Sequence, residues 1–424
     1  MLQKKVVIIG GGFAGINFAQ HLSNHPNFDI TLADKDNYNF FPPLLYQVAT
    51  GFLEASNISY PFRKMFQKKK NLHFRMGSLL RVLAAENKVV LSSGELEYDY
   101  LVLATGTETN FFGMEQVKAN AIPMKTLGDA LEMRNYLLQQ LEAATITTDK
   151  KEREKYLTIV IAGGGPTGVE VSGMLAEMRK HVVRKDYPEF NTVKNESHIY
   201  LVDGGSHLLA PMSAQSQKDT FDALSKIGVE IKLNTRVRDY KDDLVMLSNG
   251  ESIPSKTLIW AAGVSGKAID GLPAEALGHA NRLLTDEYQK VQHTDNIFAV
   301  GDISLLDADP GFPKGHPQVA QVALQQGKHL ADNLKRLSTG HPLKPFRYRD
   351  KGSMAIIGRN KAVADLPMPK LHFKGFIAWF MWVFIHLISL VTFRNKLTTL
   401  YNWMIAYFTR DQALRMIIRP FKKE

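Results

Sequence analysis

Short apolar runs recur along about the first 300 residues, and each predicts a buried strand. Two of them lead directly into a glycine-rich turn and a helical pattern: residues 6–9 before Gly10, and residues 158–162 before Gly163. Further runs of the same kind lie at 28–33, 98–103, 198–202, 257–261 and 295–300. Strands that alternate with helices are typical of parallel sheets, so the pattern predicts an α/β fold.

Both glycine-rich turns have the spacing G-x-G-x-x-G, which suits a dinucleotide. The first glycine permits a tight turn, the second lets a phosphate approach the backbone, and the third lets helix and strand pack closely. Free N–H groups at the helix start then form a pyrophosphate site. We expect contacts from Gly10, Gly12, Phe13, Ala14 and Gly15 in the first turn, and from Gly163, Gly165, Thr167 and Gly168 in the second. The alternative is two structural turns that bind no ligand.

A carboxylate ends the strand that follows each turn, where it could hold a ribose hydroxyl. Asp34 lies 24 residues after Gly10, and Asp203 lies 40 after Gly163, which points to an insertion at 181–197. A carboxylate repels a 2′-phosphate, and residues 204–207 contain no arginine. The second site is therefore predicted to take NAD(H), unless Asp203 only caps a turn.

Turns at other strand ends add candidate cofactor contacts. Thr105 and Gly106 follow the strand 98–103, and the Gly301-Asp302 turn suits a polar ribityl chain. The remaining candidates are Lys35, beside Asp34, and Gly263, after the strand 257–261. Two dinucleotides in one chain suggest that electrons pass from one to the other.

The length of 424 residues allows two or three domains. We expect one nucleotide domain at 1–117 and 275–340, a second inserted into it at 118–274, and a C-terminal domain at 341–424. The polar, charged residues 145–155 are expected to form a loop.

The C-terminal segment has a different pattern. Residues 375–393 include no Lys, Arg, Asp or Glu, but Gly375, Ala378, His386 and Ser389 share one helical face, which suits packing against protein. Residues 397–408 predict an amphipathic helix, with Leu397, Leu400, Tyr401, Met404, Ile405 and Phe408 on the apolar side and Asn395, Lys396, Thr398, Thr399 and Asn402 on the other. Asp411 could start a third short helix that contains Arg415 and Arg419.

Charge and tryptophan gather in the same tail. Residues 370–424 hold nine Lys or Arg and two acidic residues, which is seven of the ten net positive charges, and three of the four tryptophans. Basic and aromatic residues beside apolar helices favour a membrane surface over nucleic acid. In-plane attachment is favoured, with a membrane span or a dimer interface as the alternatives.

The chain has no cysteine, which excludes disulfides, cysteine-ligated iron–sulfur clusters and redox dithiols. No residue is assigned to a metal. Residues 1–5 lead straight into the first strand, so we expect no cleavable signal peptide.

Together these motifs resemble the type II NADH:quinone oxidoreductases. The resemblance covers nearly the whole chain, and its specific parts are PLLYQVAT at 43–50, AQVALQQG at 320–327, GSMAIIG at 352–358 and the tail. It implies two Rossmann-type domains and a C-terminal α-helical membrane-anchoring domain. It also implies FAD in the first site and NADH in the second.

The resemblance implies further roles. Glu170 would lie near the nicotinamide and flavin, and Gln321, Gln325 and Tyr46 would contact the quinone. Each residue also has a purely structural alternative. Glu170 could stabilise the helix dipole, Gln321 and Gln325 could form polar surface bonds, and Tyr46 could be a core residue. One departure is Gln325-Gln326 where some members have a glutamate, so proton delivery by a carboxylate is in doubt there.

The expected protein is a non-pumping respiratory-chain NADH dehydrogenase, peripheral on the cytoplasmic side of the cell inner membrane and homodimeric. Menaquinone and ubiquinone both stay open as acceptors. The alternatives are an NADH reductase for a soluble ferredoxin- or rubredoxin-type carrier, which needs no apolar tail, and a membrane-bound NADH sensor.

Overall fold

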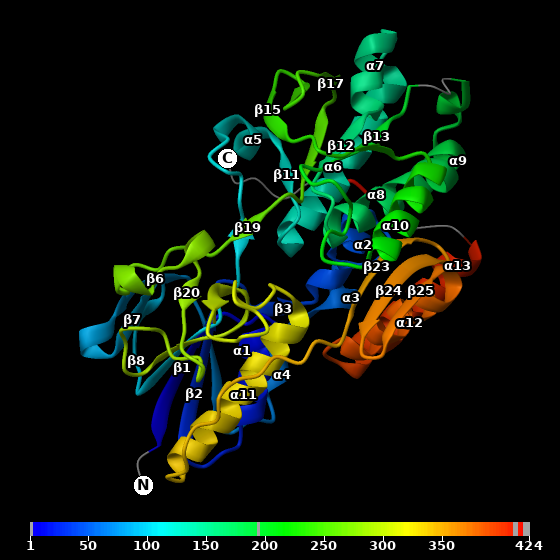
Figure 1. Ribbon diagram of the computed structural model, residues 1–424. Coiled ribbons are helices and arrows are strands. Elements are labelled where there is room, and N and C mark those ends of the chain that lie inside the picture. Colours follow the sequence, from blue (N-terminus) through cyan, green and yellow to red (C-terminus); the bar gives the residue numbers. More distant parts are fainter. Residues whose placement is uncertain (1–2, 193–195, 410–413, 419–424) are drawn as a thin grey trace. The chain divides into compact units, whose positions relative to one another are not determined.

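The computed structural model describes residues 3–192, 196–409 and 414–418 (Figure 1). The chain forms two compact units. Unit 1 consists of Met1–Phe40, Tyr60–Glu108 and Val264–Asp350, and unit 2 consists of Phe41–Ser59, Thr109–Gly263 and Lys351–Glu424. Three short strands lie close to the crossings from one unit to the other: β4 (Ser59–Pro61), β10 (Glu108–Thr109) and β19 (Val264–Ser265).

Unit 1 is built on a parallel sheet of five strands in the order β21-β9-β1-β2-β5. Four of these strands were predicted from the apolar runs, because a strand covered on both faces is apolar at every position. The five strands are β1 (Lys4–Ile9), β2 (Phe28–Asp34), β5 (Leu72–Met76), β9 (Tyr100–Leu103) and β21 (Ile297–Ala299).

Helices α1 (Phe13–Leu22) and α11 (Ala320–Ser338) lie side by side in unit 1 (Figure 1). They approach closely at Gly327, where a Cβ atom would lie 2.4 Å from the carbonyl oxygen of Ala14. The other elements of unit 1 are β3 (Tyr38–Phe40), α4 (Phe62–Phe66), the antiparallel strands β6 (Leu79–Leu83), β7 (Lys88–Leu91) and β8 (Gly94–Glu97), and the pair β20 (Leu283–Leu284) and β22 (Ser304–Leu305).

Unit 2 repeats this plan with a parallel sheet in the order β11-β18-β12-β13-β14. Its strands are β11 (Ile122–Pro123), β12 (Ile159–Ala162), β13 (Ile199–Val202), β14 (Glu230–Lys232) and β18 (Thr257–Trp260). A three-stranded antiparallel sheet adjoins it, formed by β15 (Val237–Lys241), β16 (Leu244–Leu247) and β17 (Ser252–Pro254). The two Rossmann-type folds, the second inserted into the first, are therefore confirmed.

The expected loop at 145–155 is confined to residues 147–149, because α6 (Leu127–Ile146) extends into its start and α7 (Lys150–Leu157) covers the rest. Asp149 is its N-cap, and its carboxylate accepts the backbone N–H of Glu152 at 2.8 Å. The other helices of this region are α5 (Glu115–Asn120), α6 (Leu127–Ile146), α8 (Pro166–Met178) and α10 (Ala214–Lys226). In the expected insertion, a π-helical turn (Arg179–Val183), α9 (Arg184–Asp186) and a 3-10 turn (Pro188–Thr192) continue from α8.

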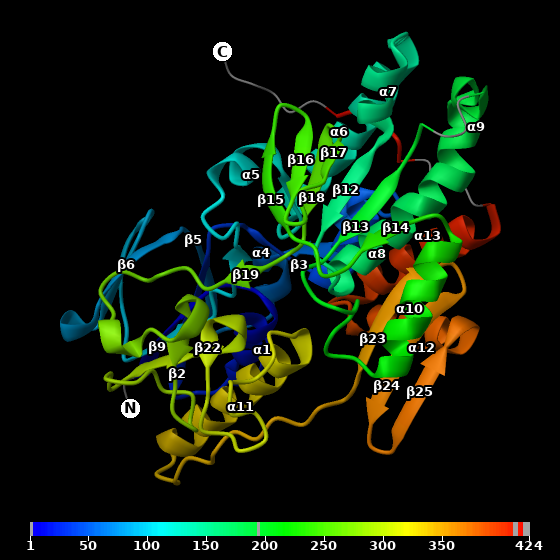
Figure 2. The same ribbon diagram turned by 45° about the horizontal axis from the view of Figure 1, so that its top comes forward.

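The C-terminal part of unit 2 begins with a feature that the sequence analysis missed, an antiparallel sheet of β23 (Ser353–Gly358), β24 (Lys361–Pro367) and β25 (Lys370–Lys374). Helices α8, α10 and α12 (Gly375–Ser389) pack against this sheet (Figure 2). Helix α13 (Phe393–Thr409) follows and packs on α3 (Ala55–Ile58), and α2 (Leu45–Ala49) lies just before α3 in the chain.

Each tail helix buries a few residues against the protein and exposes many of its apolar side chains. On α12, Ala378 is buried, as expected of the small and polar face, and Trp382 is buried as well, whereas Ser389 of that face is exposed. On α13, Thr399 is buried, and the buried amide of Asn395 donates to the carbonyls of Ser56, Asn57 and Ser59. The six residues expected on the apolar side of α13 are exposed: Leu397, Leu400, Tyr401, Met404, Ile405 and Phe408.

None of the helices within the described ranges has the length and apolar character needed to cross a membrane. The expected third helix is not present in residues 414–418, which run without regular structure, and Asp411 and Arg419 lie outside the described residues. Arg415 instead pairs with Asp186 at 2.5 Å.

Candidate functional site

The two glycine-rich turns have the same backbone geometry. Gly10 has φ +105° and Gly163 has φ +112°, values that favour glycine. A Cβ on Gly15 would lie 1.9 Å from the carbonyl oxygen of Gly10, and a Cβ on Gly168 would lie 1.8 Å from that of Gly163. The first and last glycine of each motif are therefore required by the turn itself.

The middle glycine of each turn opens onto free space. A Cβ on Gly12 or Gly165 would meet no atom within 4 Å, and neither residue caps its helix with a side chain. The first N–H groups of α1 and α8 are thus available to a phosphate, as the anion site of a dinucleotide requires. Both turns fit a bound pyrophosphate. Phe13, Ala14 and Thr167 lie in the first turns of these two helices.

The two carboxylates repeat the same contacts. Asp34 accepts the backbone N–H of Gly11 at 2.6 Å and that of Asp36 at 2.8 Å. Asp203 accepts the N–H of Gly164 at 2.6 Å and that of Gly205 at 2.6 Å. Burial raises the pKa of Asp34 above its usual value, and the two N–H donors oppose this shift. Each carboxylate is fixed beside its turn with acceptor positions left for a ribose.

A network of side chains missed by the sequence analysis shapes the rest of the first site. The buried amide of Asn39 donates to the carbonyl of Gly11 at 3.0 Å, and buried Gln326 accepts the N–H of Gly301 at 2.7 Å. The carbonyl of Asp302 accepts bonds from Arg282 at 3.0 Å and Gln318 at 3.2 Å. Nothing in the local sequence marks these residues, because their partners are distant in the chain.

The other predicted cofactor residues occupy turns or the surface. Gly106 has φ +65° and open space around a Cβ, and Thr105 and Lys35 are exposed. The carboxylate of Asp302 lies 3.4 Å from the hydroxyl of Thr107. In unit 2, a Cβ on Gly263 would lie 2.5 Å from the ring of Phe112.

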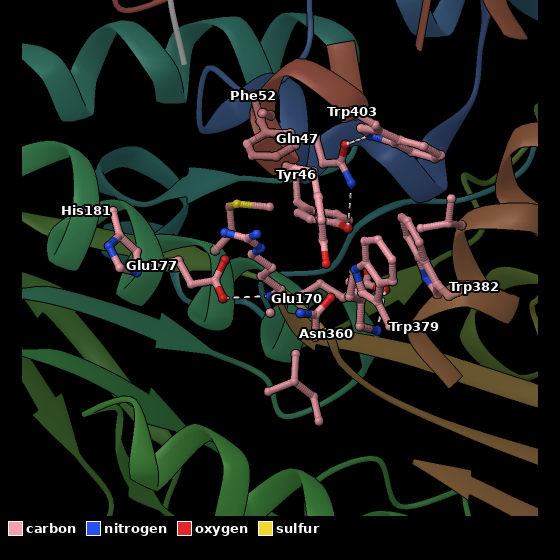
Figure 3. Close-up of a pocket in the computed structure, with 18 of the residues that line it drawn as sticks. Tyr46, Gln47, Phe52, Glu170, Glu177, His181, Asn360, Trp379, Trp382 and Trp403 are labelled. Atoms are coloured by element: carbon pink, nitrogen blue, oxygen red, sulfur yellow. Dashed lines mark hydrogen bonds between the residues drawn. The ribbon is translucent and has the colours of Figure 1, made fainter. Parts of the chain in front are cut away.

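Unit 2 also contains a cavity of about 360 Å³ (Figure 3). Side chains from two sequence regions and the C-terminal helices meet in it: Tyr46, Gln47 and Phe52 from α2 and the turn after it, Glu170, Met174 and Glu177 from α8, and Trp379, Trp382, Trp403 and Tyr407 from α12 and α13. Residues 356–360 and the π-helical turn residues His181 and Val182 also line it. The cavity is large enough for a small ring ligand.

Helix α8 is fixed against the C-terminal sheet beside this cavity. A Cβ on Gly173 would lie 1.9 Å from the carbonyl oxygen of Ile357, so only glycine permits this approach. One turn later, Glu177 accepts the N–H of Arg359 at 2.6 Å. These contacts hold the carboxylate of Glu170, on the same helix, at the cavity wall.

Glu170 is the titratable group whose environment changes its chemistry most clearly. Burial raises its pKa to about 8. A long bond from the N–H of Ile356, at 3.5 Å, and the nearby indole of Trp382 oppose this shift. The Trp382 Nε1 is buried without a hydrogen-bond partner in the described part of the chain. At neutral pH the carboxyl of Glu170 is therefore mostly protonated.

A chain of hydrogen bonds lines the opposite wall. The indole N–H of Trp403 donates to Gln47 Oε1 at 2.7 Å, and the amide of Gln47 donates to the Tyr46 hydroxyl at 2.9 Å (Figure 3). Burial raises the pKa of Tyr46, so the phenol stays protonated and can donate to a ligand. His386 stacks on Trp382 with ring centroids 4.0 Å apart, and burial lowers its pKa to about 4.

The two predicted glutamines of α11 differ in their bonding. Gln325 donates to the carbonyl of Arg349 at 2.9 Å and accepts the N–H of the same residue at 3.0 Å. Its amide is thus used in fixing residue 349, which weighs against a ligand contact. Gln321 lies one turn earlier on the helix and is partly buried.

We expect the substitution Glu170→Gln to change how stability depends on pH. Because the carboxyl has a pKa of about 8 in the folded protein, against about 4.5 in the unfolded chain, ionisation destabilises the native protein as pH rises between these values. The variant does not ionise, so its Tm should exceed that of the natural protein by roughly 2–6 °C more at pH 9 than at pH 5. A difference that does not vary with pH, measured by calorimetry, would contradict the raised pKa.

Comparison with known proteins places these features in a family. Residues 4–327 match the family model described as pyridine nucleotide-disulphide oxidoreductase, and residues 351–411 match the model of the NDH2 C-terminal domain. The chain is 35% identical to the type II NADH:quinone oxidoreductase NdhA of Mycobacterium tuberculosis, covering 96% of this chain and 88% of the relative. A second type II enzyme of that organism, Ndh, is 34% identical over the same shares.

A solved structure has the same fold. NDH2 from Plasmodium falciparum in complex with NADH superposes with a TM-score of 0.88 at 22% sequence identity, covering 98% of this chain and 100% of that one. The chain belongs to the type II NADH:quinone oxidoreductase family.

Proposed function

We propose that the chain transfers a hydride from NADH to a bound FAD and passes two electrons on to a membrane quinone, without pumping ions. The observation that carries this function is the pair of matching glycine turns in a chain whose relatives are type II NADH:quinone oxidoreductases. FAD, when bound, supplies the two-electron chemistry, and the protein supplies binding, orientation and electrostatics.

We assign FAD to unit 1 and NADH to unit 2. The FAD pyrophosphate would lie on Gly10 to Gly15, with a ribose on Asp34 and the ribityl chain beside the Gly301-Asp302 turn, which Gln326 and Arg282 hold in place. NADH would lie on Gly163 to Gly168 with a ribose on Asp203. Lys35, Thr105, Gly106 and Gly263 stay in these assignments as proposed contacts.

The cavity of unit 2 is proposed to receive the quinone ring. Its walls are largely aromatic, and they contain a phenol, an amide and a protonated carboxyl that can donate to quinone oxygens. Glu177, His181, Arg359 and Asn360 also line the cavity, and the Glu177 carboxylate accepts the backbone N–H of Arg359. Tyr46 and Gln47 donate from one wall, and Glu170 from the other. Gln321, on α11 of unit 1, stays a separate proposal for a quinone contact, whereas the bonding of Gln325 favours a structural role.

Glu170 is proposed to hold a proton at neutral pH. Quinone reduction consumes two protons, and a carboxyl with a pKa near 8 both carries a proton and can release it. The structural alternative is that Glu170 stabilises the helix dipole. That role would favour the ionised carboxylate and does not require a buried side chain.

The exposed apolar faces of α12 and α13 are proposed to dock on a membrane. Phe376, Phe380, Phe384, Leu397, Leu400 and Phe408 are each at least 36% exposed, beside the basic residues of the tail. They support the proposal that the protein is peripheral on the cytoplasmic side of the cell inner membrane. We also propose a homodimer, whose pairing through the same helices would cover part of this surface.

A soluble electron carrier is a weaker candidate for the acceptor, because such a partner gives no use to the exposed helix faces. Flavoenzymes that act through a dithiol are excluded by the absence of cysteine.

The function is tested by following the flavin in the detergent-purified protein. Anaerobic NADH should bleach its yellow spectrum, and a short-chain quinone should restore it. In Glu170→Gln we expect bleaching by NADH at the natural rate, but reoxidation by quinone slowed by roughly 10- to 100-fold. Bleaching without reoxidation in the natural protein would indicate a soluble carrier instead, and absence of flavin would favour the sensor.

The two glutamines of α11 provide a matched pair. Gln321→Ala should raise the quinone KM by roughly tenfold through loss of one hydrogen bond, whereas Gln325→Ala should leave the quinone KM unchanged and lower Tm. Steady-state kinetics with varied quinone and thermal unfolding measure both effects. An unchanged quinone KM and kcat in Gln321→Ala would remove this residue from the proposed site.

Membrane docking is tested with vesicles that contain anionic lipid. The double substitution Leu400→Glu and Phe408→Glu should weaken vesicle binding by more than about tenfold. It places two charges where apolar side chains would enter the lipid on docking. Ile146→Glu, at an 82% exposed apolar residue of α6, is the control and should bind like the natural protein. Equal binding of the double variant, with short-chain quinone activity retained in all three, would refute docking through α13.

A further inference from the structure

An arginine lies against Gly204, the residue after Asp203, although none follows Asp203 closely in the sequence. Gly204 comes directly after Asp203, and a Cβ on Gly204 would lie 2.6 Å from Nε and 2.8 Å from Cγ of Arg236. The stem of Arg236 therefore fills the space that a side chain at position 204 would occupy. Residues 204–207 contain no arginine, so this one comes from a distant part of the chain.

The backbone around Arg236 is held in place by several bonds. The turn after β14 is joined to the turn after β13, since Thr235 N–H donates to the Asp203 carbonyl at 3.0 Å and Asn234 N–H to that of Gly205 at 2.9 Å. The two strands that lead into these turns, β13 and β14, are neighbours in the sheet (Figure 2). Arg236 itself donates its N–H to Ser248 Oγ at 2.9 Å and accepts the Ser248 N–H at 2.8 Å. The approach to Gly204 is thus part of the fold.

The charge of Arg236 is available to a ligand. Its side chain is exposed, and throughout residues 3–192, 196–409 and 414–418 no carboxylate comes within the 4.0 Å of an ion pair. The neighbouring cation Lys232, by contrast, pairs with Glu251 at 2.6 Å. A guanidinium can bind phosphate through two parallel hydrogen bonds.

Asp203 and Arg236 have opposite effects on a nucleotide with a 2′-phosphate. Each oxygen of Asp203 accepts one backbone N–H and keeps a lone pair for a ribose hydroxyl, while its charge repels a phosphate at the same place. An arginine just after the carboxylate is what a site for NADP(H) usually supplies, and Arg236 provides that group from another turn.

We propose that Arg236 is a specificity-determining residue of the second nucleotide site, which attracts the 2′-phosphate of NADPH and leaves Asp203 alone to exclude this nucleotide. The proposal rests on the proposed NADH site in unit 2. The preference for NADH then depends on the balance of two opposite charges, and removal of the negative one converts the site to dual specificity.

The test compares Asp203→Asn, Arg236→Ala and the double variant, each with NADH and NADPH and a short-chain quinone. Asp203→Asn should raise kcat/KM for NADPH tenfold or more, and adding Arg236→Ala should abolish most of this gain. The gain should also shrink at high salt, because an exposed charge pair is screened. The matched control adds Arg238→Ala to Asp203→Asn. Arg238 is an exposed arginine of β15, two residues after Arg236, and its removal should keep the gain in NADPH activity.

Two further measurements support the interpretation. In the otherwise natural protein, Arg236→Ala should weaken inhibition by 2′,5′-ADP but not by 5′-ADP, which tests the contact even if the Asp203 variant does not fold. In the Arg236→Ala variant carrying Asp203→Asn, Gly204→Arg should restore NADPH use, because it returns a guanidinium to the vacated space.

The outcomes separate the two proposals. If Asp203→Asn gains NADPH activity equally with and without Arg236, the role of Arg236 is refuted and the nucleotide site stands. If Asp203→Asn changes neither nucleotide, the proposed NADH site and the role of Arg236 both fail. Equal inhibition by both ADP analogues in Arg236→Ala would also overturn the inference.

Discussion

The architecture depends on one contact that only glycine permits, in which the α carbon of a helix residue touches the carbonyl oxygen of the turn before it. Gly15 meets Gly10, and Gly168 meets Gly163, at distances that any Cβ would make impossible. This contact brings the helix start close to the strand end, so that free N–H groups and a carboxylate share one small space. Because the turn and its aspartate are bonded to each other before any ligand arrives, binding requires little rearrangement of the backbone.

In unit 2 one helix connects two kinds of chemistry. Helix α8 begins at the nucleotide turn, carries Glu170 in its early part and is fixed to the C-terminal sheet at Gly173 and Glu177. The nucleotide turn and the aromatic cavity are therefore joined through a single rigid element. A displacement at one end of α8 has to be transmitted to the other, since the glycine contact with Ile357 leaves no free space.

The sequence was sufficient for the repeated elements and insufficient for contacts between distant segments. Apolar runs predicted the main parallel strands because these strands are covered on both faces, and glycine spacing predicted both turns. Gln326 rather than Gln325 holds the Gly301-Asp302 turn, because neighbouring residues of a helix point about 100° apart and the tertiary partner decides between them. Asn39 and Arg236 reach their sites across the fold, and the charged run at 150–157 became a helix once Asp149 capped it. The roles assigned to Glu170 and Gln321 remain predictions.

Helix α13 is attached to the protein by its polar side, through Asn395 and Thr399, and presents its apolar side outward. This inversion means that the helix is already folded when it faces water, rather than folding on contact with lipid. The entropic cost of ordering the helix is met when the protein folds. Partition to a bilayer would then require only the transfer of a preformed apolar surface.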